Sequence, residues 1–165
     1  MKGIPRSRLV LWVVIGMTAF RLGGGVARGE GRVDHGLYAE LLQTYVHRGV
    51  VDYAGFQREE ARLDAYLDRL AETDTGALSR DEQLAVYINA YNAWTLKLIL
   101  SAWPEIDSIK DLGGLFTSPW EKKLVRLDGM VMTLDHLEHE IIRPRFRDPR
   151  IHFAVSYTHL RAHET

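Results

Sequence analysis

The sequence predicts an α+β fold that is mostly helical, with a central long helix at about residues 80–101, a β-hairpin at about 123–132 and an incomplete small sheet. Three observations carry this prediction. Apolar residues recur at helical spacing over several stretches, whereas segments with the composition of strands are short. The dipeptide Asp128-Gly129 separates two short apolar runs, as expected for a two-residue hairpin turn.

Two amphipathic helices are expected in the first half of the chain. The first begins near Asp34, a suitable N-cap residue, and ends at Gly49. Residues 50–53 are expected to be extended, and Gly55 then turns the chain into the second helix. The expected core residues are Leu37, Leu41, Leu42 and Tyr45 in the first helix, and Leu63, Tyr66, Leu67 and Leu70 in the second.

The long helix has clear start and stop signals. Ser79 and Glu82 are spaced as a capping box, in which each side chain binds the other residue's free backbone N–H. Pro104 shows that the helix has ended. Its apolar positions keep a helical period: Leu84, Tyr87, Ile88, Tyr91, Trp94, Thr95, Leu98 and Ile99. A helix this apolar is expected at the centre of the fold.

One further helix and one strand are expected after the hairpin. Thr133 can cap a helix that runs from Leu134 to about Arg143 and is closed by Pro144. Residues 150–154 then resemble the start of a strand.

Residues 1–27 are expected to be a secretory signal peptide. Basic residues precede an uncharged apolar run at 9–20, and small residues at 23–27 offer a cleavage site after Ala27. An N-terminal membrane anchor is the alternative, but the run is shorter than the roughly 20 residues that a spanning helix needs. We therefore expect export to the periplasm or the extracellular space, without stable membrane insertion after cleavage.

The segment Val155–Thr165 is interpreted as translated sequencing adapter rather than native sequence. It can be written in codons that match a transposase adapter used in preparing sequencing libraries. The pattern formed by His159, His163 and Glu164 would otherwise suggest a zinc site, and it is set aside for this reason. The native part of the domain is then residues 32–154, and we expect this domain to be incomplete.

Composition excludes several classes of function. The net charge of −1 gives no electrostatic reason to expect a nucleic-acid partner. The chain has no cysteine, so it has neither a disulfide framework nor a thiol nucleophile. No phosphate-binding glycine loop and no nucleophile elbow is present, and no cofactor is expected.

Two asparagines, Asn89 and Asn92, stand three residues apart in the long helix. Asparagine is a mediocre helix former, so this pair needs a reason. The amides could bind substrate or orient a catalytic group. They could equally be structural, holding neighbouring loops to the helix through buried hydrogen bonds, which is the favoured interpretation.

A polar cluster follows at residues 135–143 and contains Glu138, His139 and Arg143. A metal site is conceivable, because His136, His139 and Glu140 can share one face of a helix. The order matches neither known helical zinc motif, however, and a solvated charged face is the simpler interpretation. We expect no metal here.

His139 and His152 are the candidate catalytic residues. His152 lies in an apolar segment and is either a core residue or a general base, since the pKa of histidine is easily moved into the working range.

Five sequence blocks, in this order, resemble the domain of unknown function 547 family. They are residues 51–53, 87–93, 118–120, 134–139 with Arg143, and 150–154. The resemblance covers about Asp34 to Ala154 and implies that Asn89, Asn92, Glu138, Arg143 and the two histidines occupy characteristic positions of the family. It also implies a following segment with cysteines, where this sequence has the adapter, and it implies no established activity.

Two functional hypotheses remain. The favoured one is an exported, uncharacterised module of the cell envelope without catalytic activity, in which the polar residues are structural. The alternative is a fragment of a cysteine-dependent hydrolase or transferase whose nucleophile lies in the missing C-terminal segment. His139 or His152 would then be the base and Asn89 or Asn92 would orient it.

Overall fold

The computed structural model describes residues 32–114, 118–149, 151 and 154–155. The expected signal peptide, His152 and the three residues of the set-aside zinc pattern lie outside these residues. No helix in the described part is long and apolar enough to cross a membrane.

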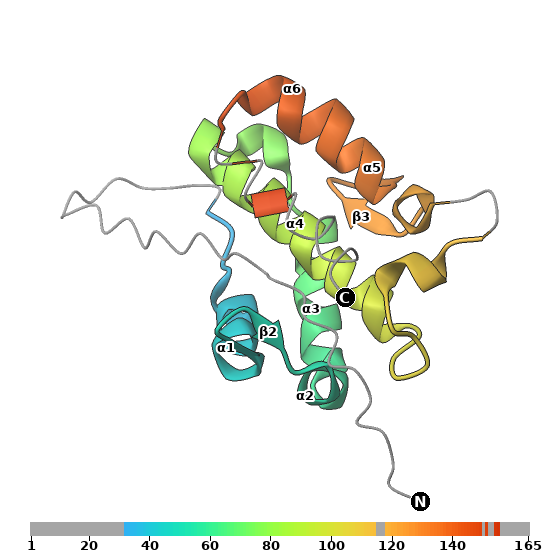
Figure 1. Ribbon diagram of the computed structural model, residues 1–165. Coiled ribbons are helices and arrows are strands. Elements are labelled where there is room, and N and C mark those ends of the chain that lie inside the picture. The colour runs from blue at the N-terminus through green and yellow to red at the C-terminus, as the bar shows by residue number, and fades with distance from the viewer. Residues whose placement is uncertain (1–31, 115–117, 150, 152–153, 156–165) are drawn as a thin grey trace, which may run out of the picture.

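The described residues form a mostly helical α+β domain (Figure 1). The part of the chain that the structure describes contains six α-helices: α1 (Gly36–Tyr45), α2 (Tyr53–Arg58), α3 (Glu60–Ala71), α4 (Arg80–Leu100), α5 (Leu134–His136) and α6 (Arg143–Phe146). A π-helical segment, η4 (Leu137–Ile142), joins the last two. Three 3-10 turns are η1 (Thr75–Ala77), η2 (Ile109–Leu112) and η3 (Pro119–Glu121). The strands β1 (Val46–His47), β2 (Val50–Val51), β3 (Val125–Leu127) and β4 (Met130–Met132) form two separate antiparallel pairs.

Helix α4 is the centre of the domain, as its sequence predicts. It contacts α3, the strand β3 and the segment η4. Most of its residues from Val86 to Leu100 are buried. The predicted capping box is confirmed: Ser79 N donates to Glu82 Oε2 at 3.0 Å, and Glu82 N donates to Ser79 Oγ at 3.4 Å. The local start signal and the apolar surface therefore agree with the tertiary packing.

The first helix is shorter than expected. It ends at Tyr45, and the chain then forms the tight β1–β2 hairpin. The turn residues Arg48 and Gly49 have φ angles of 51° and 78°, the left-handed conformation that two-residue hairpin turns require. His35 rather than Asp34 occupies the N-cap position, although Asp34 Oδ1 still accepts from Gly36 N at 2.8 Å. Residues 50–51 are extended as predicted, but Tyr53 already belongs to α2.

The β3–β4 hairpin is confirmed. Val125 pairs with Met132 and Leu127 with Met130. Asp128 and Gly129 have φ angles of 55° and 69°, as in a primed turn. The Asp128 carboxylate also accepts from the backbone N and the hydroxyl of Thr75, at 3.3 and 2.6 Å, so the hairpin turn is attached to η1.

Pro144 does not close the last helix, contrary to expectation. The chain remains helical through α5, η4 and α6, and Pro144 lies in the first turn of α6. Proline lacks a backbone N–H and its ring clashes with the carbonyl four residues earlier. The wider π-helical turn directly before it changes the hydrogen-bonding pattern at this point, which lets the helix continue.

The prediction of a strand at residues 150–154 is wrong for the residues of this segment that the structure describes. Ile151 and Ala154 are in helical conformation, and so is the buried Val155 that follows. Ile151 N donates to Asp148 O at 3.0 Å, so the backbone is satisfied locally. A strand would need a neighbouring strand for this purpose, and a short helical turn does not.

Candidate functional site

The polar cluster predicted from the sequence lies on the π-helical segment η4. Glu138 and His139 belong to this segment, and Arg143 is the first residue of α6. In an ideal α-helix Glu138 and Arg143 would not be one turn apart. The i→i+5 geometry of a π-helix, by contrast, brings residues five apart together, and such turns are frequent at functional sites.

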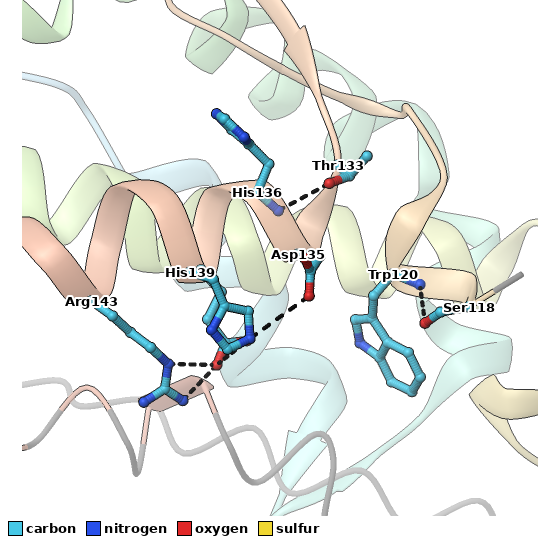
Figure 2. Close-up of polar contacts among 8 residues, drawn as sticks. Ser118, Trp120, Thr133, Asp135, His136, His139 and Arg143 are labelled. Atoms are coloured by element: carbon cyan, nitrogen blue, oxygen red, sulfur yellow. Dashed lines mark hydrogen bonds and ion pairs between the residues drawn. The ribbon is translucent and has the colours of Figure 1, made fainter.

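Glu138 and Arg143 form an ion pair whose carboxylate is buried and whose guanidinium group is partly exposed. Glu138 is 2% exposed. Its Oε1 accepts hydrogen bonds from Arg143 Nε at 3.0 Å and from Arg143 Nη2 at 2.6 Å (Figure 2). Burying a carboxylate costs free energy unless it has a partner of opposite charge and is hydrogen-bonded. The guanidinium group of Arg143 supplies both the opposite charge and the hydrogen bonds.

His139 lies beside this pair but faces solvent. Its Nε2 is 3.7 Å from Asp135 Oδ1, one helical turn earlier, and 4.0 Å from Glu138 Oε1. The side chains of His139 and Asp135 are 51% and 57% exposed. These distances exceed those of a hydrogen bond, so the imidazole is near two carboxylates without being fixed by either.

A second block of the sequence meets the cluster. The turn η3 contacts α5, and Figure 2 shows the indole of Trp120 on the side of α5 from which the Asp135 side chain projects. Ser118 begins this turn, and its hydroxyl accepts from Trp120 N at 3.3 Å. Thr133 begins α5 by accepting from His136 N at 2.9 Å. Two local caps therefore set the positions of Trp120 and Asp135, which are far apart in the sequence.

An open pocket of about 280 Å³ lies beside Arg143. Its lining residues are Arg143, Arg147, Asp148, Pro149 and Ile151. Sequence reasoning did not select Arg147 or Asp148. The available signal was the high density of arginine at residues 143–150.

The two asparagines are not part of this cluster by any hydrogen bond. Asn92 is 7% exposed and Asn89 is partly buried, both on α4. Neither side chain is hydrogen-bonded to another described residue. The loop-holding role that the sequence favoured for them therefore stays a prediction, as does a role in orienting a base.

Among the described residues, no group of three or more histidine, aspartate or glutamate side chains could hold a metal ion. What the cluster offers chemically is a neutralised carboxylate, a half-exposed imidazole and an arginine at the edge of a pocket.

Comparison with known proteins assigns the chain to a family. A family model described as "Protein of unknown function, DUF547" matches residues 75–162. The match ends eight positions beyond Ala154, and the adapter interpretation of that segment stays a prediction. No curated protein and no solved structure matches the chain. The matched residues contain α4, the β3–β4 hairpin and the polar cluster, and they span more than half of the sequence, so the chain belongs to the DUF547 family.

Proposed function

We propose that the protein is an exported, non-catalytic module of the cell envelope, in which the polar cluster stabilises the fold. The observation that carries the proposal is the closed Glu138–Arg143 pair. Both guanidinium donors bind one oxygen of a carboxylate whose side chain is 3% exposed. Such a carboxylate is already neutralised and is poorly placed to take a proton from a substrate.

The remaining polar groups also fit a non-catalytic role. His139 is half-exposed, and the sequence contains no cysteine that it could activate. An active centre usually holds its base by a hydrogen bond to an orienting group, and the 3.7 Å separation from Asp135 does not provide one.

Catalytic inactivity is tested by comparing the chain with its His139→Asn variant. Hydrolysis of p-nitrophenyl acetate is measured across pH 6 to 9. We expect the two proteins to give the same rate, with no saturation by the ester. A saturable rate that falls at least tenfold in the variant would contradict the proposal.

Export is tested separately, because it depends on a different part of the chain. The chain is expressed with a C-terminal tag in a bacterium, and the fractions are analysed by N-terminal sequencing. Export with cleavage after Ala27 predicts a periplasmic product that begins at Arg28. A membrane-bound product that keeps residues 1–27 would support the anchor, and a cytoplasmic one would contradict export.

A second candidate function is favoured by the Asp135–His139 pair. These residues are one helical turn apart, and the carboxylate lies 3.7 Å from the imidazole. A small side-chain rotation would make this the carboxylate–histidine half of a catalytic triad. The thiol of a cysteine-dependent hydrolase or transferase would then come from a segment outside this sequence.

This second proposal is tested at the source locus. The coding sequence is read across the codon of Ala154, and any cysteine in a continuing frame is tested for alkylation by iodoacetamide. Alkylation that slows at least tenfold in the His139→Asn background would support the enzyme. A frame without cysteine, or alkylation that is independent of His139, would rule it out.

A further inference from the structure

Strand β4 is an open edge of the β3–β4 hairpin. The two strands form a sheet of their own, and no third strand pairs with either of them in the described part of the chain. Strand β3 packs against α3 and α4, whereas the main contact of β4 is β3 itself. An edge strand presents backbone donors and acceptors to which a further strand can bind.

The register of the hairpin shows which backbone groups face this edge. Leu127 and Met130 flank the two-residue turn, so they are the hydrogen-bonded pair that closes it. The next pair of the antiparallel ladder, Arg126 with Val131, is then not hydrogen-bonded across the hairpin. The N–H and the C=O of Val131 therefore point away from β3. No described residue outside the hairpin is hydrogen-bonded to either group.

The side chains along the same edge are apolar and exposed. Met130 is 53% exposed and Val131 is 61% exposed, and these two are the exposed large hydrophobic residues of the described chain. The segment 129–133, G-M-V-M-T, contains neither a charged residue nor a proline. Native edge strands are commonly protected against pairing by lysine, by proline or by a bulge. The continuous register of β4 with β3 has no bulge, so β4 has none of these protections.

The hairpin is held in place by its contacts with α3. Gly129 N donates to Ala71 O at 3.1 Å, which attaches the turn to the end of this helix. Arg126 Nη2 donates to Asp68 Oδ1 at 2.6 Å, which attaches β3 to the same helix. A partner that binds the edge therefore does not have to order the hairpin first, and the entropic cost of association is reduced.

We propose that β4 pairs with β4 of a second copy of this chain, as antiparallel strands related by a two-fold axis at Val131. Val131 offers one donor and one acceptor on the same edge, so two copies form two reciprocal hydrogen bonds. Met130 then lies opposite Met132 of the second copy. Two isolated two-stranded sheets become one sheet of four strands, in the order β3–β4–β4–β3. The proposal is independent of the proposed function, because it uses none of the residues of the polar cluster.

Charge is compatible with a second copy as the occupant of this edge. A two-fold axis brings like residues together, and the uncharged segment 129–133 places no like charges opposite each other. The two copies of Arg126 would be three strand spacings apart, or about 14 Å. This distance exceeds the Debye length of about 10 Å at 0.1 M salt, and each Arg126 is paired with Asp68. A strongly charged partner, by contrast, would find no complementary charge on the segment 129–133.

The contact area determines the strength of the dimer. A three-residue strand from each copy buries much less than the roughly 800 Å² per partner of a standard interface. We therefore expect a weak, reversible dimer with a dissociation constant on the order of 0.1–1 mM.

The test uses the absence of cysteine from the sequence, because a single introduced cysteine then reports on one position. Residues opposite each other in a hydrogen-bonded antiparallel pair have Cα atoms about 5.5 Å apart, within the range of a disulfide. The full chain with Val131→Cys is oxidised with copper phenanthroline at several protein concentrations, and the linked dimer is measured on non-reducing gels. Gln43→Cys is the matched control, because Gln43 is exposed on α1, and Figure 1 places α1 and β3 on opposite sides of α3.

A second measurement uses sedimentation equilibrium of Val131→Lys, which adds a charge at the two-fold axis, and of Gln43→Lys, which adds the same charge on α1. Circular dichroism checks the fold of every variant. We expect the Val131→Cys dimer to form at least tenfold faster than the Gln43→Cys dimer. We also expect Val131→Lys to weaken association at least tenfold, while Gln43→Lys leaves it unchanged.

Equal rates of disulfide formation at the two positions would overturn the proposal, since they would place the association in another segment, such as the apolar run at 9–20. Association that Val131→Lys leaves unchanged, or a chain that stays monomeric throughout the concentration series, would also overturn it.

Discussion

The ion pair between Glu138 of η4 and Arg143 of α6 gives the most direct test of how this domain is held together. The perturbation is Arg143→Gln, which keeps much of the side-chain volume and removes the positive charge. Glu138 Oε1 would lose the hydrogen bonds at 2.6 and 3.0 Å that Arg143 donates to it. The carboxylate stays buried, because its exposure is set by the surrounding helices.

The magnitude follows from the unequal burial of the two partners. Removing one partner of a fully buried pair costs about 3–5 kcal/mol. The side chain of Glu138 is 3% exposed but that of Arg143 is 35% exposed, so part of the interaction is screened by water. We therefore expect a loss of about 2–3 kcal/mol, which corresponds to a fall in Tm of roughly 4–12 °C for a chain of this size.

Two comparisons make the argument specific. Glu138→Gln removes the buried charge and leaves Arg143, which can reach solvent, so we expect a smaller loss of about 1 kcal/mol. Arg62→Gln breaks an ion pair with Glu40 of similar length, 2.7 Å, whose side chains are 43% and 68% exposed, and a longer one with Glu59 at 3.5 Å. For such an exposed pair we expect less than about 1 kcal/mol.

The assay is thermal and urea-induced unfolding followed by circular dichroism, with all proteins measured under the same conditions. If Arg143→Gln costs no more than Arg62→Gln, burial does not strengthen the pair and the reasoning is refuted. If Glu138→Gln lowers the free energy of unfolding more than Arg143→Gln does, the cost does not come from a buried carboxylate that has lost its partner.

Three further predictions concern the rest of the fold. Thr75→Ala removes the hydrogen bonds of the Thr75 hydroxyl with Asp128 (2.6 Å) and Tyr87 (3.1 Å). We expect this to lower the free energy of unfolding in urea by about 1–2 kcal/mol. Thr44→Ala is the control and should cost little, because it removes only an exposed hydrogen bond to the backbone of its own helix. Gly55→Ala places a Cβ against the Tyr45 ring and 2.6 Å from Asp52 Oδ2, so it should destabilise the protein by about 2 kcal/mol. Gly76→Ala is the control and should be tolerated, because its Cβ meets only the Asp74 side chain, at 3.2 Å. Equal losses for the two variants would show that the close packing around Gly55 does not determine the cost. Burial lowers the pKa of the His35 imidazole below its ordinary value of 6.5. The unfolded chain therefore binds a proton at His35 more tightly than the folded state does. As a result, the folded state should lose stability as the pH falls below about 6.5. His35→Gln should reduce this loss between pH 7 and 5, and an unchanged pH profile would contradict the assignment.

Much of the helical frame could be predicted from the sequence, because its signals are local. The capping box at Ser79, the apolar period of α4 and the dipeptide Asp128-Gly129 each act through neighbouring residues, and each appears in the structure as predicted. The boundaries of α1 and α6 could not be predicted in the same way. Arg48 supplies a left-handed turn residue without being a glycine, and Pro144 is tolerated because a π-helical turn precedes it.

The candidate site shows the same division. Sequence alone selected Glu138, His139 and Arg143 as a group, since they are close in the chain. Only the tertiary structure decided that Glu138 is buried against Arg143 while His139 faces solvent, because burial depends on which side of η4 packs against α4. Only the tertiary structure places Arg80 beside Arg145, 65 positions away, since contacts between distant segments are set by the packing of whole helices rather than by local preference.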